Sequence, residues 1–336
     1  MTNSISYVTW ACYSDGKWAS ILDKVTHVIA PSIVISSATN PTLIGMYSGN
    51  ISATFPDIVS KAHVAGVKAL PYLFSNSSYV TLAQVKSAGK VQALCENLKN
   101  LVDQFNLDGI DIDLEESMPA GGLDAFVKQL RATLGPGKLI THAGSGYGGM
   151  KLSAASINYV DMVNPMCYDM WGYPDQTQGY PQGNYEDSIK ACLRWTAAGW
   201  PKEKINLLAA FYGSSQGGGN HTKWKDIVAR YPTCPDSQDV FKINNLDTEI
   251  NNVDTIKKKA QWCKDNLGGI GYFACSYDVF ESPHSLLDAA WSVIKPVPTL
   301  PAPPTPHQPP AKVLNVAITK VDGTQETIEA SSVTVS

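Results

Sequence analysis

The 336-residue sequence is short of charge, because only 17% of its residues are Asp, Glu, Lys or Arg. Its 26 basic residues are outnumbered by 30 acidic ones, which gives a net charge of -4. Such a chain has no positive field that would gather phosphate groups. We therefore expect no nucleic-acid partner and no binding to an anionic membrane, and a neutral substrate fits better.

The sequence also lacks the cysteine spacing that zinc sites use. Its seven cysteines lie far apart and include no CxxC pair. We interpret them as mostly buried thiols.

Targeting and membrane segments are missing as well. The first residues, MTNSISYVTWACYSDGKW, contain no cationic start followed by an apolar run, so we expect no signal peptide in this chain. No apolar run reaches the length of a membrane-spanning helix, so we expect no membrane span. The compartment stays open, because a leader can be removed and the sequons at Asn50, Asn76 and Asn220 are short enough to arise by chance.

Short β-rich runs alternate with helical patterns through most of the chain. Strands are predicted at 4–10, 26–35, 67–74, 107–115, 139–144, 159–169, 205–211 and 269–277. Helices are predicted between them, at 85–105, 122–134, 187–199 and 254–269 among others. Eight β/α units in roughly 290 residues favour an α/β fold of the (β/α)8 TIM-barrel type over a doubly wound sheet.

The pattern ends before residue 296. The stretch 296–310, PVPTLPAPPTPHQPP, is dense in proline, which removes amide donors and favours an extended linker. Residues 311–336 contain two β-like runs around Asp322 and Gly323, which signal a hairpin, but the segment is too short to hold a core. We predict a barrel at 1–295, a linker at 296–310 and a β-like tail at 311–336. The tail is either a disordered terminus or an element that docks to another protein or module.

The stretch LDGIDIDLEE, residues 107–116, crowds five acids among large aliphatic residues. In a strand, successive side chains point to opposite faces, so Asp111, Asp113 and Glu115 share one face and the aliphatic residues between them share the other. Burying unpaired carboxylates costs several kcal/mol each, so stability alone does not explain this row. Glu115 stands at its C-terminal end, where a TIM barrel places its chemistry.

Three interpretations compete for the row. A solvated acidic edge is disfavoured by the interleaved apolar face. A Mg²⁺ or Ca²⁺ site would need further oxygen ligands, and no second cluster accompanies the row. We favour acid/base catalysis, in which neighbouring acids keep one carboxyl group protonated near neutral pH.

Two motifs carry a resemblance to a known family. DGIDIDLE, residues 108–115, resembles the DGxDxDxE signature of glycoside hydrolase family 18, the chitinases and related endo-β-N-acetylglucosaminidases, and it falls on the fourth predicted strand. MCYD, Met166 to Asp169, is similar to the family's MxYD motif and follows the sixth strand. The resemblance covers about residues 4–295 and leaves the tail outside it.

The resemblance implies roles for the matching residues, in a family whose nucleophile is the acetamido group of the substrate itself. Glu115 would be the general acid, and Asp113 would orient the acetamido group and stabilise the oxazolinium ion. Asp111 would lie deeper and share a proton with Asp113. Tyr168 would donate a hydrogen bond to the acetamido oxygen, with Asp169 beside it. No metal and no other cofactor is implied.

The sequence departs from the family pattern on two strands. On the third strand, LPYLFSN places Tyr72 near the serine of the usual Ser-x-Gly-Gly motif. On the eighth strand, the usual tryptophan beneath the sugar is replaced by Phe273, or by Tyr272 if the register differs by one residue. Phenylalanine stacks on a sugar with a smaller face.

Several other side chains at or beyond strand ends are candidates for sugar binding. Met166 is included as part of the MxYD match. Aromatic side chains there either stack on pyranose rings or belong to core and rim packing. The aromatic candidates are Trp10, Tyr147, Trp171, Tyr173 and Tyr212.

The resemblance implies a retaining, substrate-assisted hydrolase of β-1,4-linked N-acetylglucosamine polymers, a chitinase acting on chitin or its oligosaccharides outside the cell. About 57 residues separate the last two strands, which leaves little room for the α+β domain that deepens the cleft in some relatives, so we expect an open groove and cleavage within chains. Two alternatives stay open, an endo-β-N-acetylglucosaminidase acting on N-glycans and a chitin-binding lectin on the same barrel. The intact Glu115 argues against the lectin.

Overall fold

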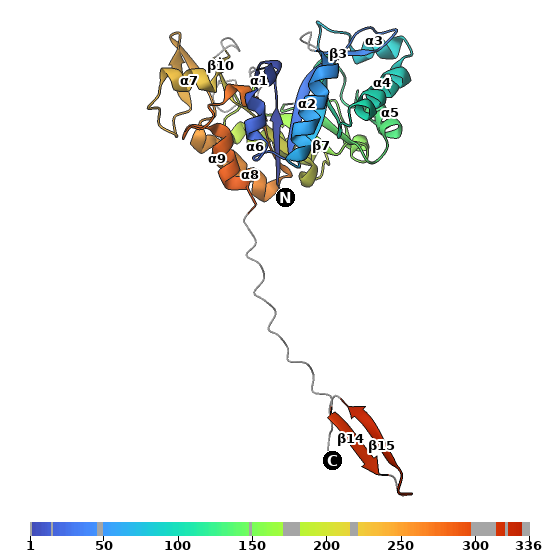
Figure 1. Cartoon of the computed structure of the whole chain (residues 1–336). Helices are drawn as coiled ribbons and strands as arrows, with labels where there is room; N and C mark the ends of the chain where they lie inside the picture. The colour runs from blue at the N-terminus through green and yellow to red at the C-terminus, as the bar shows by residue number, and fades with distance from the viewer. Residues whose placement is uncertain are drawn as a thin grey trace. The chain divides into compact units, whose positions relative to one another are not determined.

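A computed structural model describes residues 2–14, 16–45, 50–147, 150–170, 182–215, 221–296, 314–319 and 322–330 (Figure 1). The chain divides into two compact units, Met1–Lys295 and Pro296–Ser336.

Eight parallel strands of the first unit form a closed barrel. They are β1 (Asn3–Tyr7), β2 (His27–Ile35), β4 (Lys68–Ser75), β5 (Gly109–Leu114), β6 (Leu139–Ser145), β7 (Met162–Met166), β8 (Asn206–Ala210) and β13 (Gly269–Phe273). Each strand pairs with its neighbours in this order, and β1 closes the ring by pairing with both β13 and β2. The predicted (β/α)8 barrel is confirmed.

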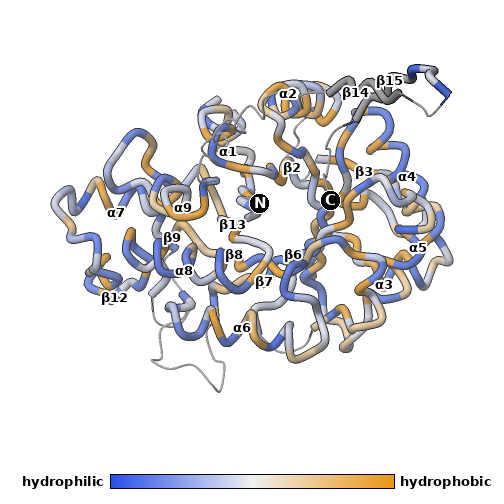
Figure 2. The backbone as a smooth tube through the Cα atoms, turned by 90° about the horizontal axis from the view of Figure 1, so that it is seen from below, coloured by the Kyte–Doolittle hydropathy of each residue, from blue (hydrophilic) through white to orange (hydrophobic). Residues whose placement is uncertain are grey.

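Helices lie outside this ring of strands, as the view along the barrel shows (Figure 2). They are α1 (Trp10–Ser14), α2 (Ile51–Val64), α3 (Leu82–Ser87), α4 (Val91–Gln104), α5 (Asp124–Leu134), α6 (Tyr185–Ala197), α7 (Trp224–Arg230), α8 (Val253–Asn266) and α9 (Leu286–Ile294). Short 3-10 turns are η1 (Lys17–Ile21), η2 (Ala154–Ser156), η3 (Lys202–Lys204) and η4 (Cys275–Tyr277).

Several sequence predictions about element bounds are wrong. The predicted strand 269–277 ends at Phe273 and the predicted strand 159–169 is confined to Met162–Met166. The predicted helix 85–105 is two helices, α3 and α4, because Gly89 between them has a φ of 67°, which a helix cannot continue through. The predicted strand 4–10 ends at Tyr7, and Trp10 begins α1.

The expectation that the segment between the last two barrel strands leaves little room for an α+β domain is also wrong. Residues between β8 and β13 hold a small α+β insertion that contains α7 and the strands β9 (Tyr212–Ser215), β10 (Thr222–Lys223), β11 (Val240–Ile243) and β12 (Leu246–Glu249). The helix that follows the insertion, α8, packs against the barrel strands β8 and β13. These strands form an antiparallel sheet in the order β10-β9-β12-β11. Asn244 and Asn245 join β11 to β12 with φ values of 50° and 65°, the signature of a tight two-residue hairpin turn. This turn lets two strands of only four residues pair with each other.

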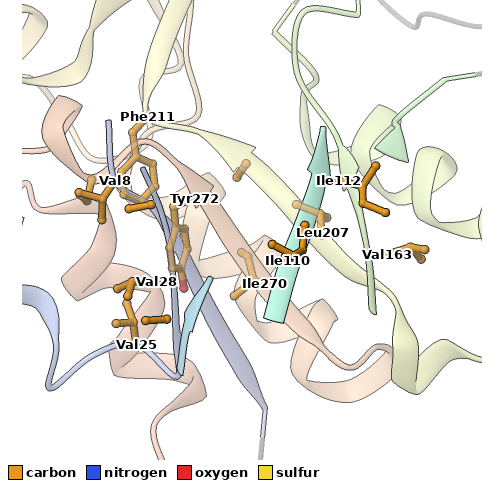
Figure 3. Packing of buried hydrophobic residues seen from close by; sticks show 14 of the residues in the cluster. Val8, Val25, Val28, Ile110, Ile112, Val163, Leu207, Phe211, Ile270 and Tyr272 are labelled. Carbon is orange, nitrogen blue, oxygen red and sulfur yellow. The ribbon is translucent and has the colours of Figure 1, made fainter. Parts of the chain in front are cut away.

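The alternation predicted for β5 places its two faces in different surroundings. Ile110, Ile112 and Leu114 are buried in the large apolar cluster that packs strands against helices, part of which Figure 3 shows. A smaller cluster, which includes Tyr7 and Tyr72, lies inside the barrel, where Tyr7 contacts Asp111. Gly109 begins the strand because a Cβ atom there would lie 2.0 Å from the carbonyl oxygen of Leu139 on β6.

One further strand, β3 (Leu43–Gly45), pairs antiparallel with β2 at the edge of the barrel sheet. All seven cysteines are buried and free, as predicted. Among the described residues no helix has the length and apolarity needed to cross a bilayer.

The second unit contains a β-hairpin. Its strands β14 (Leu314–Thr319) and β15 (Gln325–Ala330) pair antiparallel, with Asp322 and Gly323 between them. Gly323 has a φ of 85°, which favours glycine in the turn. The predicted linker lies outside the described residues except for Pro296.

Candidate active site

Asp111 is the deepest acid of the row on β5 and is completely buried. Its Oδ2 accepts a 2.8 Å hydrogen bond from the hydroxyl of Tyr7 on β1. Its Oδ1 accepts a hydrogen bond from Thr141 on β6. Burial raises the pKa of Asp111 to about 6, and the two hydrogen bonds oppose this rise. The adjacent strand β6 and the more distant strand β1 therefore hold Asp111 in place, and neither of these bonds involves Asp113.

Asp113 lies one strand step nearer to the C-terminal face and keeps 8% of its surface exposed. Its Oδ1 is buried and has no hydrogen-bond partner in the described part of the protein. Burial, followed by the charges of Glu115 and Asp111, raises the pKa of Asp113 well above its ordinary value, while Lys151 lowers it. A buried carboxyl oxygen without a partner is costly, which makes Asp113 a candidate for contact with a bound group.

Glu115 follows the end of β5 and is exposed to the surface. Its amide donates a 2.7 Å hydrogen bond to the carbonyl of Ser75, which fixes the backbone beside the end of β4. Although the residue as a whole is exposed, the protein around its carboxyl group raises its pKa by desolvation. Lys151 opposes the rise and Asp169 adds to it. An acid with a raised pKa, accessible from outside, suits proton donation.

Two charged residues near this row have different functions in the structure, and sequence reasoning assigned neither to the site. Lys151, in the loop after β6, donates a hydrogen bond to the carbonyl of Leu114. Glu116 is buried and accepts hydrogen bonds from the hydroxyl of Ser75 and from the amide of Ala83 in the first turn of α3. Glu116 therefore anchors α3 to the end of β5.

Asp108, at the start of the acidic stretch, lies at the opposite end of β5. It accepts hydrogen bonds from Lys68, from the amide of Ala69 and from the ring of His63. Desolvation raises the pKa of Asp108, but these partners outweigh it and leave the pKa below its ordinary value. Asp108 thus supports the entry into the strand.

Tyr168 and Asp169 follow β7 and face the acidic row. Desolvation, together with the charges of nearby Tyr212, Asp113 and Asp169, raises the pKa of Tyr168 well above its ordinary value, so its hydroxyl stays protonated. Asp169 has a φ of 51°, a left-handed conformation uncommon for a residue with a side chain. Its carboxylate accepts a hydrogen bond from Tyr212 and lies 3.5 Å from Nε2 of His221.

Aromatic rings form one wall beside these acids. Phe273, at the end of β13, stacks on Tyr168 with ring centroids 6.1 Å apart and also contacts Tyr7 at 5.9 Å. Tyr72 packs edge-on against Tyr7 at 5.8 Å. Tyr272 is fully buried and stacks on Phe211 instead. The eighth-strand residue at the site is therefore Phe273.

Two cavities open on either side of Glu115. The first measures about 420 Å³, and the second about 620 Å³. Both are lined by Glu115, Met166, Tyr168 and Asp169. The first is completed by Tyr72, Phe74, Asn76, Tyr79, Asp113, Tyr212, His221, Lys223, Phe273 and Tyr277. The second is completed by Leu114, Glu116, Ser117, Met118, His142, Ala143, Ser145, Gly146, Tyr147 and Lys151.

Most site residues predicted from the sequence line these cavities. Tyr7 and Asp111 lie beneath them, joined by their hydrogen bond. The placement of the Trp10 side chain and of Trp171 and Tyr173 lies outside the described residues. The predicted platform Tyr212 is buried and joins the wall through Asp169.

Sequence reasoning missed the contribution of two other segments to the first cavity. Phe74, Asn76 and Tyr79 come from the end of β4 and the loop after it, and His221 and Lys223 come from the α+β insertion. The aromatic and amide residues in LFSNSSY after the third predicted strand were an available signal, because barrel loops at that end carry function. The insertion offered no comparable signal, because its strands are only two to four residues long.

The described residues contain no group of three or more His, Cys, Asp or Glu side chains arranged to hold a metal ion. The acid row lies beside Lys151, tyrosines and apolar side chains. Its chemistry is that of coupled carboxyl groups beside a partly apolar cavity.

Comparison with known proteins identifies the barrel. A chitinase from Flavobacterium johnsoniae has a TM-score of 0.72 at 22% identity, covering 87% of this chain and 94% of that one. A chitinase from Bacteroides thetaiotaomicron has a TM-score of 0.72 at 20% identity, covering 88% and 97%. A chitinase-like agglutinin from Robinia pseudoacacia has a TM-score of 0.66 at 18% identity, covering 86% and 99%.

At these identities the structural likeness shows the fold. A search of curated protein sequences finds no match. The family model for glycosyl hydrolases family 18 matches residues 3–278, which include the acid row, both cavities and the α+β insertion. The chain therefore belongs to glycosyl hydrolase family 18.

Proposed function

We propose that the protein is a retaining, substrate-assisted hydrolase of β-1,4-linked N-acetylglucosamine polymers, a chitinase. The observation that carries the proposal is the buried Oδ1 of Asp113, which has no hydrogen-bond partner in the described part of the protein and belongs to a residue that lines the first cavity beside Glu115. An acetamido N–H is the kind of donor that such an oxygen lacks.

The proposed reaction assigns one task to each group. Glu115 donates its proton to the glycosidic oxygen as the bond to the anomeric carbon breaks. The acetamido oxygen of the same sugar attacks that carbon and forms an oxazolinium ion, which Asp113 stabilises. Tyr168 donates a hydrogen bond to the acetamido group, and Asp111 supports Asp113 from below. Water then opens the ring, with Glu115 taking its proton, so the β configuration is kept.

The environment of each group supports its task. Desolvation raises the pKa of Glu115, which favours the protonated form that donates. Burial holds Tyr168 in its protonated form, which is the form that donates. Phe273 lines the first cavity and supplies an apolar face for a sugar ring.

Cleavage within chains rests on the two cavities. They meet at Glu115, so sugars can occupy both sides of the scissile bond. The absence of an α+β domain no longer supports cleavage within chains, because the insertion is present and its residues His221 and Lys223 line part of the first cavity. We retain endo-cleavage as the proposal on the strength of the second cavity.

The test is a time course with chitin oligosaccharides in which products and anomers are resolved. We expect the first-formed reducing end to be β, and oligosaccharides without acetyl groups to resist cleavage because they lack the nucleophile. An initial α product, or rapid cleavage of the deacetylated oligosaccharides, would contradict the mechanism.

Assays on a high-mannose glycoprotein, colloidal chitin and chitin oligosaccharides distinguish the two alternative functions from a chitinase. An endo-β-N-acetylglucosaminidase would release glycans from a high-mannose glycoprotein and leave colloidal chitin intact. A lectin would bind chitin oligosaccharides without products, as the fold shared with the Robinia agglutinin allows. The alternative with the weaker support is the lectin, because Glu115, the proposed acid, is present and lines both cavities.

A further inference from the structure

Lys151 is anchored beside the acid row at both of its ends. Its backbone oxygen accepts a 2.9 Å hydrogen bond from the amide of Leu123, just before α5. Its Nζ donates to the carbonyl of Leu114, the residue before Glu115. The ammonium is therefore tied to the backbone of β5 rather than left free in solvent.

The second cavity is otherwise acidic. Glu115, Glu116 and Asp169 line it, and Lys151 is the only lysine or arginine among its lining residues. His142 also lines it, but burial lowers its pKa to about 4, so the ring is neutral near neutral pH. In the described part of the protein, no carboxylate lies close enough to Lys151 to form a salt bridge with it.

We propose that Lys151 is a positioning residue that holds a positive charge beside Asp113 and Glu115 and thereby sets the pH range in which the site works. The inference rests on the proposed function, because that function makes Glu115 a proton donor. The reason is electrostatic, since a nearby cation favours the ionised form of a carboxyl group.

The charges that surround the row define the effect of Lys151. Glu115 faces Lys151 and Asp169. Asp113 faces Glu115, Asp111 and Lys151, and it also influences the hydroxyls of Tyr7 and Tyr168.

Burial lowers the pKa of Lys151, and the charges of Glu115, Asp113 and Glu116 oppose this shift and favour the ammonium form. Within the described ranges, only Lys151 lowers the pKa values of both Glu115 and Asp113. Loss of its charge therefore raises the pKa of the proton donor, and the alkaline limb of the activity profile moves to higher pH.

The test compares three variants by the pH dependence of kcat/KM on a soluble chitin oligosaccharide. Lys151→Met removes the charge and the donor, Lys151→Gln removes the charge and carries a neutral donor, and Lys151→Arg keeps the charge. We expect both neutral variants to move the alkaline limb upward by about half to one pH unit and the arginine variant to keep it. The gap between wild type and Lys151→Met should narrow at about 0.5 M NaCl, because salt screens the charge.

Other results would overturn the inference. If the alkaline limb of the kcat/KM profile is unchanged in both neutral variants and activity falls equally at every pH, Lys151 has only a structural role. Restoration of the wild-type limb by Lys151→Gln would assign the effect to the hydrogen bond with Leu114. If neither neutral variant folds and Lys151→Arg does, the charge of Lys151 is needed for folding rather than for setting the pH range.

The proposed function can fail separately from this inference. If the wild type cleaves no N-acetylglucosamine polymer, the proposed function is wrong. The effect of the Lys151 charge on Asp113 and Glu115 is then measured by carboxyl ¹³C NMR titration of wild type and Lys151→Met. Identical titration of Asp113 and Glu115 in the two proteins would overturn the inference.

Discussion

The hydroxyl of Tyr7 donates a 2.8 Å hydrogen bond to Oδ2 of Asp111, 104 positions away in the sequence. Thr141 donates to the other oxygen of the same carboxylate. Both oxygens of the deepest acid are thus satisfied by strands on either side of the barrel, while Oδ1 of Asp113, in the described part of the protein, keeps no partner. This difference fixes Asp111 and leaves Asp113 available for a ligand.

Tyr7→Phe is expected to destabilise the fold more at pH 8 than at pH 5. Because the folded-state pKa of Asp111 is about 6, above its ordinary value, the stability linked to its proton is present at low pH and lost as pH rises through that value. Loss of the Tyr7 donor raises that pKa further. Urea unfolding should show a cost of about 1.5 to 3 kcal/mol at pH 8 and less at pH 5.

Tyr272→Phe is the matched control, because Tyr272 is buried like Tyr7 and no carboxylate is among the groups that shift its pKa. Its effect should not change between the two pH values. Equal costs for Tyr7→Phe at both pH values would show that the hydrogen bond does not depend on the charge of Asp111.

Glu115→Gln should fold normally and lose about 10² to 10⁴ in kcat, because the amide keeps the shape of the side chain and cannot give a proton. Asp108→Asn makes a matched acid-to-amide change at the opposite end of β5, where the carboxylate accepts hydrogen bonds from Lys68 and from the amide of Ala69. It should cost about 1 kcal/mol in stability and leave kcat of the folded protein nearly unchanged. Rates on a soluble oligosaccharide, with melting curves, check both. Substantial turnover by Glu115→Gln would place the acid elsewhere.

Phe273→Ala should lower kcat/KM about 10- to 100-fold, since the apolar face beside Tyr168 is lost. Phe273→Trp should tighten binding, because a larger ring covers more of the sugar. Calorimetry with the Glu115→Gln background separates binding from turnover. Affinity unaffected by either substitution would mean that the sugar rests on another surface.

Removal of residues 296–336 should leave hydrolysis of soluble oligosaccharides within about twofold of the full chain, because both cavities lie in the first unit. The last helix, α9, stays attached within that unit, where Lys264 donates a 2.7 Å hydrogen bond to the carbonyl of Val293. Activity and melting curves of the two proteins check this. Aggregation of the shortened protein would show that the barrel needs the tail, whereas loss of binding to insoluble chitin alone would make the tail a docking element.

Much of the candidate site could be predicted because its acids lie on one strand. The period of two along IDIDLE places Asp111, Asp113 and Glu115 on one face whatever the rest of the barrel does. The eight strands were also identifiable from local composition. The bounds failed where one residue changes the backbone, as Gly89 does between α3 and α4.

The sequence by itself determined the barrel, the acid row and the match to family motifs, because all three are local patterns along the chain. Only the tertiary structure decided which groups surround the row. Tyr7, Thr141 and Lys151 reach it from β1, β6 and the loop after β6, and His221 reaches Asp169 from the insertion. No local period relates these residues to β5, since their approach depends on barrel closure and loop conformation, so the charge balance that tunes the acids is a property of the folded chain alone.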